Sequence, residues 1–114
     1  MAKKRIYISA PISGHDIAER KAYFAQVAKQ LVIIGSTPVN PFDNRLPLIA
    51  SHADHMRADL RMLLSCDAYI IAADTATSAG CRTEAHVAEA CGIPRVGIIS
   101  ASAAVTFTKD ITKI

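Results

Sequence analysis

Two short and nearly continuous apolar runs, at residues 67–73 and 95–100, constrain this chain more than any other feature. Strands that are apolar on every side suit a parallel sheet covered on both faces, whereas a half-exposed strand alternates apolar and polar residues. Between the two runs, residues 82–91 carry a helical pattern that Gly92 closes. A strand, a helix and a second strand in this order predict a right-handed crossover within a parallel sheet.

The same alternation continues towards the N-terminus of the chain. Residue composition and apolar spacing predict two further strands and two further helices: strands at 5–9 and 37–40, and helices at 17–34 and 51–66. Strands that alternate with helices predict a single α/β domain over residues 1–114. We expect a flavodoxin- or Rossmann-like three-layer sandwich around a central parallel sheet of four or five strands. The pattern leaves the structure of residues 101–114 open.

Composition excludes several classes of protein. With 51% hydrophobic and 20% charged residues, the chain can bury a core and is not of the disordered type. No apolar run approaches the roughly 20 residues that cross a bilayer. The basic residues 3–5 lead into a short strand-like run instead of a signal-peptide core. We therefore expect a soluble, cytoplasmic protein without a membrane partner.

Charge, aromatic content and ligand spacing limit the possible partners. The net charge of +3 comes mostly from scattered basic residues, and aromatic residues make up 5% of a chain that lacks Trp. A stacking platform for a nucleic-acid polymer is therefore not expected. The three cysteines and four histidines have no spacing typical of metal ligands, and neither a G-x-G-x-x-G fingerprint nor a P-loop occurs. We expect no metal and no cofactor.

The carboxyl ends of the strands are the expected place for a ligand, because parallel α/β sheets bind ligands there. Three loops follow these strand ends, at residues 10–16, 40–50 and 74–80. Hydroxyl and free N–H groups suited to an anion come from Ser9, Ser13, Gly14, Ser78 and Gly80. Ser78 has an alternative role as a plain N-cap of the helix that follows it.

Glu84 is the residue best suited to chemistry. It lies near the start of the third helix, and the neighbouring Val87 and Ala88 indicate that it faces the buried side of that helix. The helix macrodipole favours an ionised carboxylate there. Such a carboxylate, partly desolvated and facing a ligand, is suited to nucleophilic attack on a sugar carbon. The alternative, an ordinary glutamate without a chemical role, fits the sequence equally well.

Asp59 borders the apolar stripe of the second helix. Near Glu84, it would form a carboxyl pair whose pKa values separate, so that one group stays ionised while the other donates a proton. The alternative, which is more common for helical aspartates, is a solvated side chain paired with Arg57 or Arg61. Tyr7 lies inside the first strand, where its ring suits the core and its hydroxyl can reach a pocket.

Five short stretches carry a resemblance to a known family: Ile6-Tyr7-Ile8-Ser9-Ala10-Pro11-Ile12-Ser13-Gly14, Val39-Asn40-Pro41, Met56-Arg57-Ala58-Asp59-Leu60, Cys66-Asp67-Ala68-Tyr69 and Ser78-Ala79-Gly80-Cys81-Arg82-Thr83-Glu84. Together they resemble the nucleoside 2-deoxyribosyltransferase superfamily, and most of all its small members known only as a domain of unknown function. The resemblance spans residues 5 to about 100, and the joint pattern is more specific than any one stretch. It implies one such domain that cleaves the N-glycosidic bond of a (deoxy)nucleoside or its 5′-monophosphate, by hydrolysis or deoxyribosyl transfer.

The resemblance also implies roles for individual residues. The Glu of the S-x-G-x-x-x-E stretch, here Glu84, is the nucleophile that takes the sugar from the base. The Asp of the second helix, here Asp59, handles the base or its proton, and the first-strand Tyr, here Tyr7, orients the nucleophile. Ser78 resembles the branch that hydrolyses deoxynucleoside 5′-monophosphates, where this Ser meets the phosphate. Asn40 lies in a matched stretch and is expected at the substrate site with Ser9, Ser13, Gly14, Ser78 and Gly80.

A small-molecule nucleoside or nucleotide and a second copy of the chain are the expected partners, because relatives commonly complete their sites across an interface. Ala10 and Cys81 depart from the usual residues of the family. The chain is shorter than characterised transferases and lacks a C-terminal segment that supplies an Asn to a neighbouring site, which favours hydrolysis or binding. A non-catalytic nucleotide-binding or sensing module, using the same pocket, is the alternative function. Release of free base distinguishes the two.

Overall fold

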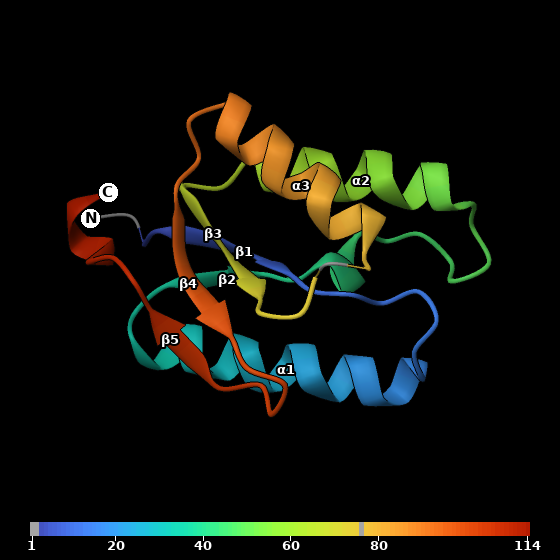
Figure 1. The fold of residues 1–114 in the computed structure, drawn as a ribbon, viewed down its shortest axis with the longest axis horizontal. Coiled ribbons are helices and arrows are strands. Elements are labelled where there is room, and N and C mark those ends of the chain that lie inside the picture. Colours follow the sequence, from blue (N-terminus) through green and yellow to red (C-terminus); the bar gives the residue numbers. More distant parts are fainter. Residues whose placement is uncertain (1–2, 76) are drawn as a thin grey trace.

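The computed structural model describes residues 3–75 and 77–114, and Figure 1 shows a central sheet with helices on both faces. The sheet consists of β1 (Arg5–Ser9), β2 (Thr37–Val39), β3 (Ala68–Ala72), β4 (Arg95–Ile99) and β5 (Val105–Phe107), in the order β2-β1-β3-β4-β5. One face is covered by α1 (Ile17–Ile33), and the other by α2 (His52–Leu64) and α3 (Ala79–Ala90). Short 3-10 turns, η1 (Pro41–Asp43) and η2 (Ile111–Lys113), complete the chain. The α/β sandwich predicted from the sequence is confirmed.

The sheet is parallel from β2 to β4, and β5 runs antiparallel to β4. The turn between β4 and β5 is tight, because the N–H of Ser100 donates to the carbonyl of Ala104 at 2.8 Å. A return this short permits an antiparallel neighbour, whereas a parallel one needs a crossover of a dozen or more residues. The sequence pattern left the structure of residues 101–114 open, and this turn explains why a strand, β5, forms there.

Two helices start and end differently from the sequence prediction. The third helix begins at Ala79, three residues before the predicted start at residue 82, because Ser78 Oγ accepts a hydrogen bond from the N–H of Cys81 at 3.2 Å. The second begins after Ser51, which caps it in the same way, and ends at Leu64. Gly80 therefore lies in the first turn of α3 instead of in a loop, where its N–H is still among those without an intrahelical acceptor. Residue 76, in the predicted loop 74–80, lies outside the described residues.

Alternation along β1 decides which of its side chains reach the site. Ile6 and Ile8 pack with Phe24 in the core that α1 covers. Tyr7 packs on the other face of the sheet, with Leu63 and Cys81 from the α2 and α3 side. Since successive side chains of a strand point to opposite faces, Ser9 shares the face of Tyr7.

The helices bury one stripe each and leave the rest in solvent. In α1 the buried residues are Tyr23, Phe24, Val27 and Leu31, and Gly35 beyond its end has a φ of +84°, a conformation that ends the helix. Within the described part of the chain, none of the helices combines the length and the apolar character needed to cross a membrane.

Candidate active site

The pocket lies where the chain changes direction across the sheet. From β1, the connection to β2 goes to one side and β3 lies on the other side, a switch point of the kind that holds ligands in doubly wound sheets. A cavity of about 680 Å³ opens there, within the size range of small-molecule sites. Its walls come from residues 10–15, 41–50 and 77–81, together with side chains of α2 and α3. These are the three loops that the sequence pattern predicts at the carboxyl ends of the strands.

Glu84 lines this pocket and is held by two hydroxyl groups from β1. The Tyr7 hydroxyl donates a hydrogen bond to Oε2 of Glu84, and Ser9 Oγ donates to Oε1 at 2.8 Å. Tyr7 and Ser9 are two residues apart on one face of β1, so they reach the same carboxyl group from one rigid element. Glu84, in the second turn of α3, is only 6% exposed.

Burial raises the pKa of Glu84 from 4.5 to about 7. The hydrogen bonds from Tyr7 and Ser9 lower this pKa, and the negative charge of Asp59 raises it. A pKa of about 7 leaves Glu84 only partly ionised at neutral pH, whereas the sequence predicted a carboxylate kept ionised by the helix macrodipole. The macrodipole acts mainly within the first turn, and desolvation has the larger effect on the pKa of Glu84. Burial and the charge of Glu84 also raise the pKa of Tyr7 well above 10, which keeps its hydroxyl protonated as a donor.

Asp59 lies on α2 and lines the same pocket, half-buried. Its Oδ1 accepts a hydrogen bond from Asn44 Nδ2 at 2.9 Å, in place of the Arg57 or Arg61 partner that the sequence left as an alternative. Burial raises the pKa of Asp59, whereas the Asn44 hydrogen bond and the charges of His55 and His52 lower it. A raised pKa favours the protonated form, which can donate a proton to a ligand.

The two carboxyl groups therefore share one pocket in different surroundings. Asp59 is near enough to raise the pKa of both Glu84 and Tyr7 through its charge. Carboxyl pairs in unlike surroundings can divide the roles of nucleophile and acid. This is the chemistry that the arrangement supports.

The remaining predicted residues divide into two groups. Ser13, Gly14, Ser78 and Gly80 all line the pocket, and the φ of +81° at Gly14 provides the turn after β1. Asn40 is not among the lining residues: its side chain accepts a hydrogen bond from the N–H of Phe42 at 3.0 Å and caps η1.

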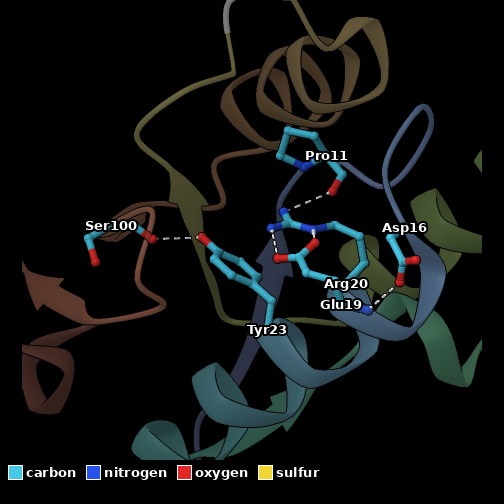
Figure 2. A network of polar contacts seen from close by, with 6 residues as sticks. All are labelled: Pro11, Asp16, Glu19, Arg20, Tyr23 and Ser100. Carbon is cyan, nitrogen blue, oxygen red and sulfur yellow. Dashed lines mark hydrogen bonds and ion pairs between the residues drawn. The ribbon is translucent and has the colours of Figure 1, made fainter.

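A network around Arg20 anchors the wall formed by residues 10–16, as Figure 2 shows. Arg20 Nη1 donates to the carbonyl of Pro11 at 3.3 Å, and the guanidinium pairs with Glu19 at 2.6 Å. The guanidinium also lies 4.2 Å from the ring centroid of Tyr23, whose hydroxyl donates to the carbonyl of Ser100 at 3.0 Å. The loop after β1 is thus connected to both α1 and the β4–β5 turn.

Asn44 and His55 are among the pocket residues that sequence reasoning missed. Asn44 and His55 both line the cavity, and Asn44 Nδ2 lies 3.0 Å from His55 Nδ1 as well as against Asp59. Asn44 lies in a long loop without a motif. His55 and Asp59 are four residues apart, a spacing that puts both on one face of α2 and that was a usable signal.

Metal ligands are not grouped in the part of the chain that the structure describes. Across residues 3–75 and 77–114, no set of three or more His, Cys, Asp or Glu side chains is arranged to hold a metal ion. Cys66, Cys81 and Cys91 are free thiols.

Two solved structures are similar to this chain. A 2-deoxyribosyltransferase from Bacillus psychrosaccharolyticus has a TM-score of 0.63 at 20% sequence identity, over 90% of this chain and 76% of that chain. A 2-deoxyribosyltransferase from Leishmania mexicana has a TM-score of 0.66 at 20% identity, over 92% of this chain and 79% of that chain. At this level of identity the similarity establishes a common fold. No curated protein matches the chain.

A family model matches most of the sequence. The family described as Domain of unknown function (DUF4406) matches residues 4–96, which include all three helices and the first three strands. This match agrees with the resemblance, stated from sequence, to small members known only as a domain of unknown function, and the two solved structures show that the chain shares the fold of two 2-deoxyribosyltransferases. The protein belongs to the DUF4406 family.

Proposed function

We propose that this protein cleaves the N-glycosidic bond of a (deoxy)nucleoside or its 5′-monophosphate, with Glu84 as the nucleophile and residues 1–114 as one deoxyribosyltransferase-like domain. The observation that carries the proposal is the carboxyl group of Glu84, buried between the hydroxyls of Tyr7 and Ser9 in the pocket that Asp59 also lines. The fold supports it, because it is shared with two proteins named as 2-deoxyribosyltransferases.

The reaction has two steps. In the first, an ionised Glu84 oxygen attacks the anomeric carbon of the sugar and forms an ester. The bond from that carbon to the base nitrogen breaks, and its electron pair stays on the base, which takes a proton from Asp59. In the second, water or the nitrogen of another base attacks the same carbon, loses a proton to Asp59, and releases the Glu84 carboxylate. Retaining glycosidases divide two carboxyl groups in this manner.

Tyr7 and Ser9 have a defined task in this scheme. Both hydroxyls donate to Glu84, so they fix its carboxyl plane and lower its pKa towards the ionised form. The more of Glu84 that is ionised at neutral pH, the more enzyme can begin the first step.

The phosphate of a 5′-monophosphate would meet the start of α3 and the loop after β1. Ser78, Gly80, Ser13 and Gly14 line that part of the pocket and offer hydroxyl and N–H donors. Replacing Ser78 by Ala should weaken binding of monophosphates more than binding of free nucleosides. A Ser78→Gly variant controls for the loss of the helix cap, because Gly at this position costs only a few tenths of a kcal/mol.

Assembly and location are part of the proposal. Exposed apolar side chains at Val32, Ile33 and Ile34, which follow one another at the end of α1, favour a homodimer or larger oligomer, because grouped apolar side chains are often covered by a partner. Sedimentation that finds a monomer at micromolar concentration would contradict this. Free thiols at Cys66, Cys81 and Cys91 fit the reducing cytoplasm.

The experiment is a base-release assay with a panel of nucleosides, deoxynucleosides and their 5′-monophosphates, followed by chromatography. Free base with free sugar indicates hydrolysis, and a new nucleoside in the presence of a second base indicates transfer. The proposal requires release by the wild-type protein. Ligand binding in calorimetry without release from any substrate would instead establish the alternative, a non-catalytic nucleotide-binding or sensing module.

A further inference from the structure

Asn44 connects three parts of the pocket through one side chain. Its Nδ2 donates to Asp59 Oδ1 at 2.9 Å and contacts His55 Nδ1 at 3.0 Å, and its Oδ1 accepts from the N–H of Leu46 at 3.0 Å. Both amide hydrogens and the carbonyl oxygen are therefore in use. The loop after η1 and two side chains of α2 are held in one arrangement by this amide.

The orientation of every group in the cluster is determined by its partners. A backbone N–H can only donate, so the atom of Asn44 that faces Leu46 is the oxygen and the atom that faces Asp59 and His55 is the nitrogen. His55 Nε2 lies 3.1 Å from the carbonyl of Pro47, which can only accept. In its neutral form, His55 is therefore the Nε2–H tautomer, whose Nδ1 accepts from Asn44.

The backbone beside Asn44 is strained, and the hydrogen bonds of Asn44 help to hold it in this conformation. Arg45 has a φ of +66°, in the left-handed region that residues with a Cβ rarely adopt. Such a conformation persists when surrounding contacts hold it. The hydrogen bond from Leu46 to Asn44 closes a turn across Arg45 and so provides one of these contacts.

We infer that Asn44 is a positioning residue, which acts through Asp59 by holding that carboxyl group and the ring of His55 in one fixed arrangement on the pocket wall. The inference rests on the proposed function in one respect: Asp59 is the group that protonates the departing base. Without Asn44, Asp59 has no other hydrogen-bond donor among its contacts in the described structure, and its carboxyl group is free to rotate.

The test combines side-chain NMR with kinetics on the whole protein. Carbon-detected titration of the Asp59 carboxyl group and nitrogen shifts of the His55 ring are recorded for the wild type and for Asn44→Ala and Asn44→Asp. The Asn44→Asp variant keeps an oxygen for the N–H of Leu46 but loses the donor to Asp59 and His55. Asn40→Ala is the matched control, because it removes a cap from the same loop without a contact to Asp59.

We expect the Asn44 variants to differ from the wild type and from Asn40→Ala in the titration of Asp59 and in kcat. In the wild type, the neutral ring of His55 is the Nε2–H tautomer. Both Asn44 variants move the Asp59 titration to higher pH, because the hydrogen bond that lowers its pKa is lost, and Asn40→Ala leaves the titration in place. In the base-release assay, both Asn44 variants lose about 10- to 100-fold in kcat with a smaller change in KM, as expected for a misplaced catalytic group.

Three outcomes overturn the inference: an unchanged Asp59 titration in Asn44→Ala, a shift as large in Asn40→Ala, or an unchanged kcat despite a shifted titration. Restoration of the wild-type titration in Asn44→Asp would equally overturn it, since the effect would then come from the turn alone. If the wild type releases no base but the titrations behave as expected, the proposed function fails while the positioning of Asp59 by Asn44 stands.

Discussion

The two carboxyl groups of the pocket are held in contrasting ways. Glu84 is buried on α3 and receives two hydroxyl donors from a central strand, β1. Asp59 is half-buried on α2 and receives one amide donor from Asn44, in a loop with a strained backbone. A donor set on a strand of the sheet is fixed by the core, whereas one on a loop depends on local contacts.

The contrast assigns different roles to the two groups. A nucleophile must meet one carbon atom at a fixed distance, which suits a carboxyl group held from both sides by β1. A proton donor must be reached by the departing base, which suits the more exposed carboxyl group of Asp59. The hydroxyl donors also oppose the effect of burial on the pKa of Glu84, so part of the population stays ionised at neutral pH.

Replacing Glu84 by Gln tests the first side of this contrast. The amide keeps the size of the side chain but is not a nucleophile, so base release should fall by about 10³-fold or more while ligand binding persists. The measurement is the rate of base release, with binding followed by calorimetry. Glu89→Gln, an exposed position on the same helix, is the control and should behave as the wild type. Turnover that survives in Glu84→Gln would discard the mechanism.

The second side of the contrast is tested by Asp59→Asn. Loss of a general acid should reduce kcat about 100-fold or more for natural nucleosides. The loss should be much smaller for a substrate whose leaving group departs without a proton, such as a nitrophenyl deoxyriboside. Asp54→Asn, on an exposed part of α2, is the matched control. Equal losses on both substrates would remove Asp59 from the role of proton donor.

Burial of Glu84 also predicts how stability depends on pH. Its pKa is about 7 in the folded protein and about 4.5 in the unfolded chain, so the folded state binds the proton more tightly. The contribution to the free energy of unfolding is complete below pH 4.5 and is lost as the pH rises to about 7, by roughly 3 kcal/mol.

Glu84→Gln should remove this dependence. Denaturant unfolding near pH 5 and near pH 8 should therefore find the variant gaining on the wild type at the higher pH. A gap between the two proteins that is the same at both values would indicate that the carboxyl group titrates at its ordinary pKa when folded.

Removing the Tyr7 hydroxyl should give a smaller effect on the same group. Since Glu84 acts in its ionised form, kcat/KM should rise with pH through about 7 in the wild type. Tyr7→Phe removes a hydrogen bond that lowers the pKa, so the rise should move to higher pH and activity at neutral pH should fall about tenfold for each unit of the move. Tyr69→Phe is the control, because Tyr69 lies in the same buried cluster and the hydroxyl that donates to Glu84 is that of Tyr7. A pH profile that does not move would mean that Tyr7 is not coupled to the reacting carboxyl group.

Much of the fold could be predicted because local residue patterns indicate most of its strands and helices. The apolar runs around Ile70 and Val96 and the helical spacing of Phe24, Val27 and Leu31 identify strands and helices without reference to the rest of the chain. The antiparallel direction of β5 could not be predicted, because it depends on the tight turn between Ser100 and Ala104.

The site was predictable where it follows from periodicity. Tyr7 and Ser9 share a strand face, and Glu84 lies on the buried face of its helix, so their approach to one another follows from how α3 packs on the sheet. Asn44 and Asp59 are 15 residues apart, and their contact depends on the course of the loop between them. No local sequence pattern indicates that course. The raised pKa of Glu84 likewise comes from tertiary burial and not from its place in the helix.

Detection of a sugar bound to Glu84 would test the nucleophilic role directly. The protein is mixed with a 2′-fluorinated nucleoside, which slows both steps by disfavouring positive charge at the anomeric carbon, then quenched in acid, digested and examined by mass spectrometry. The expected result is one sugar residue on the peptide that contains Glu84 in the wild type, and none in Glu84→Gln. Base release with no adduct on any peptide, or with the sugar attached to Asp59, would contradict the assignment of Glu84 as the nucleophile.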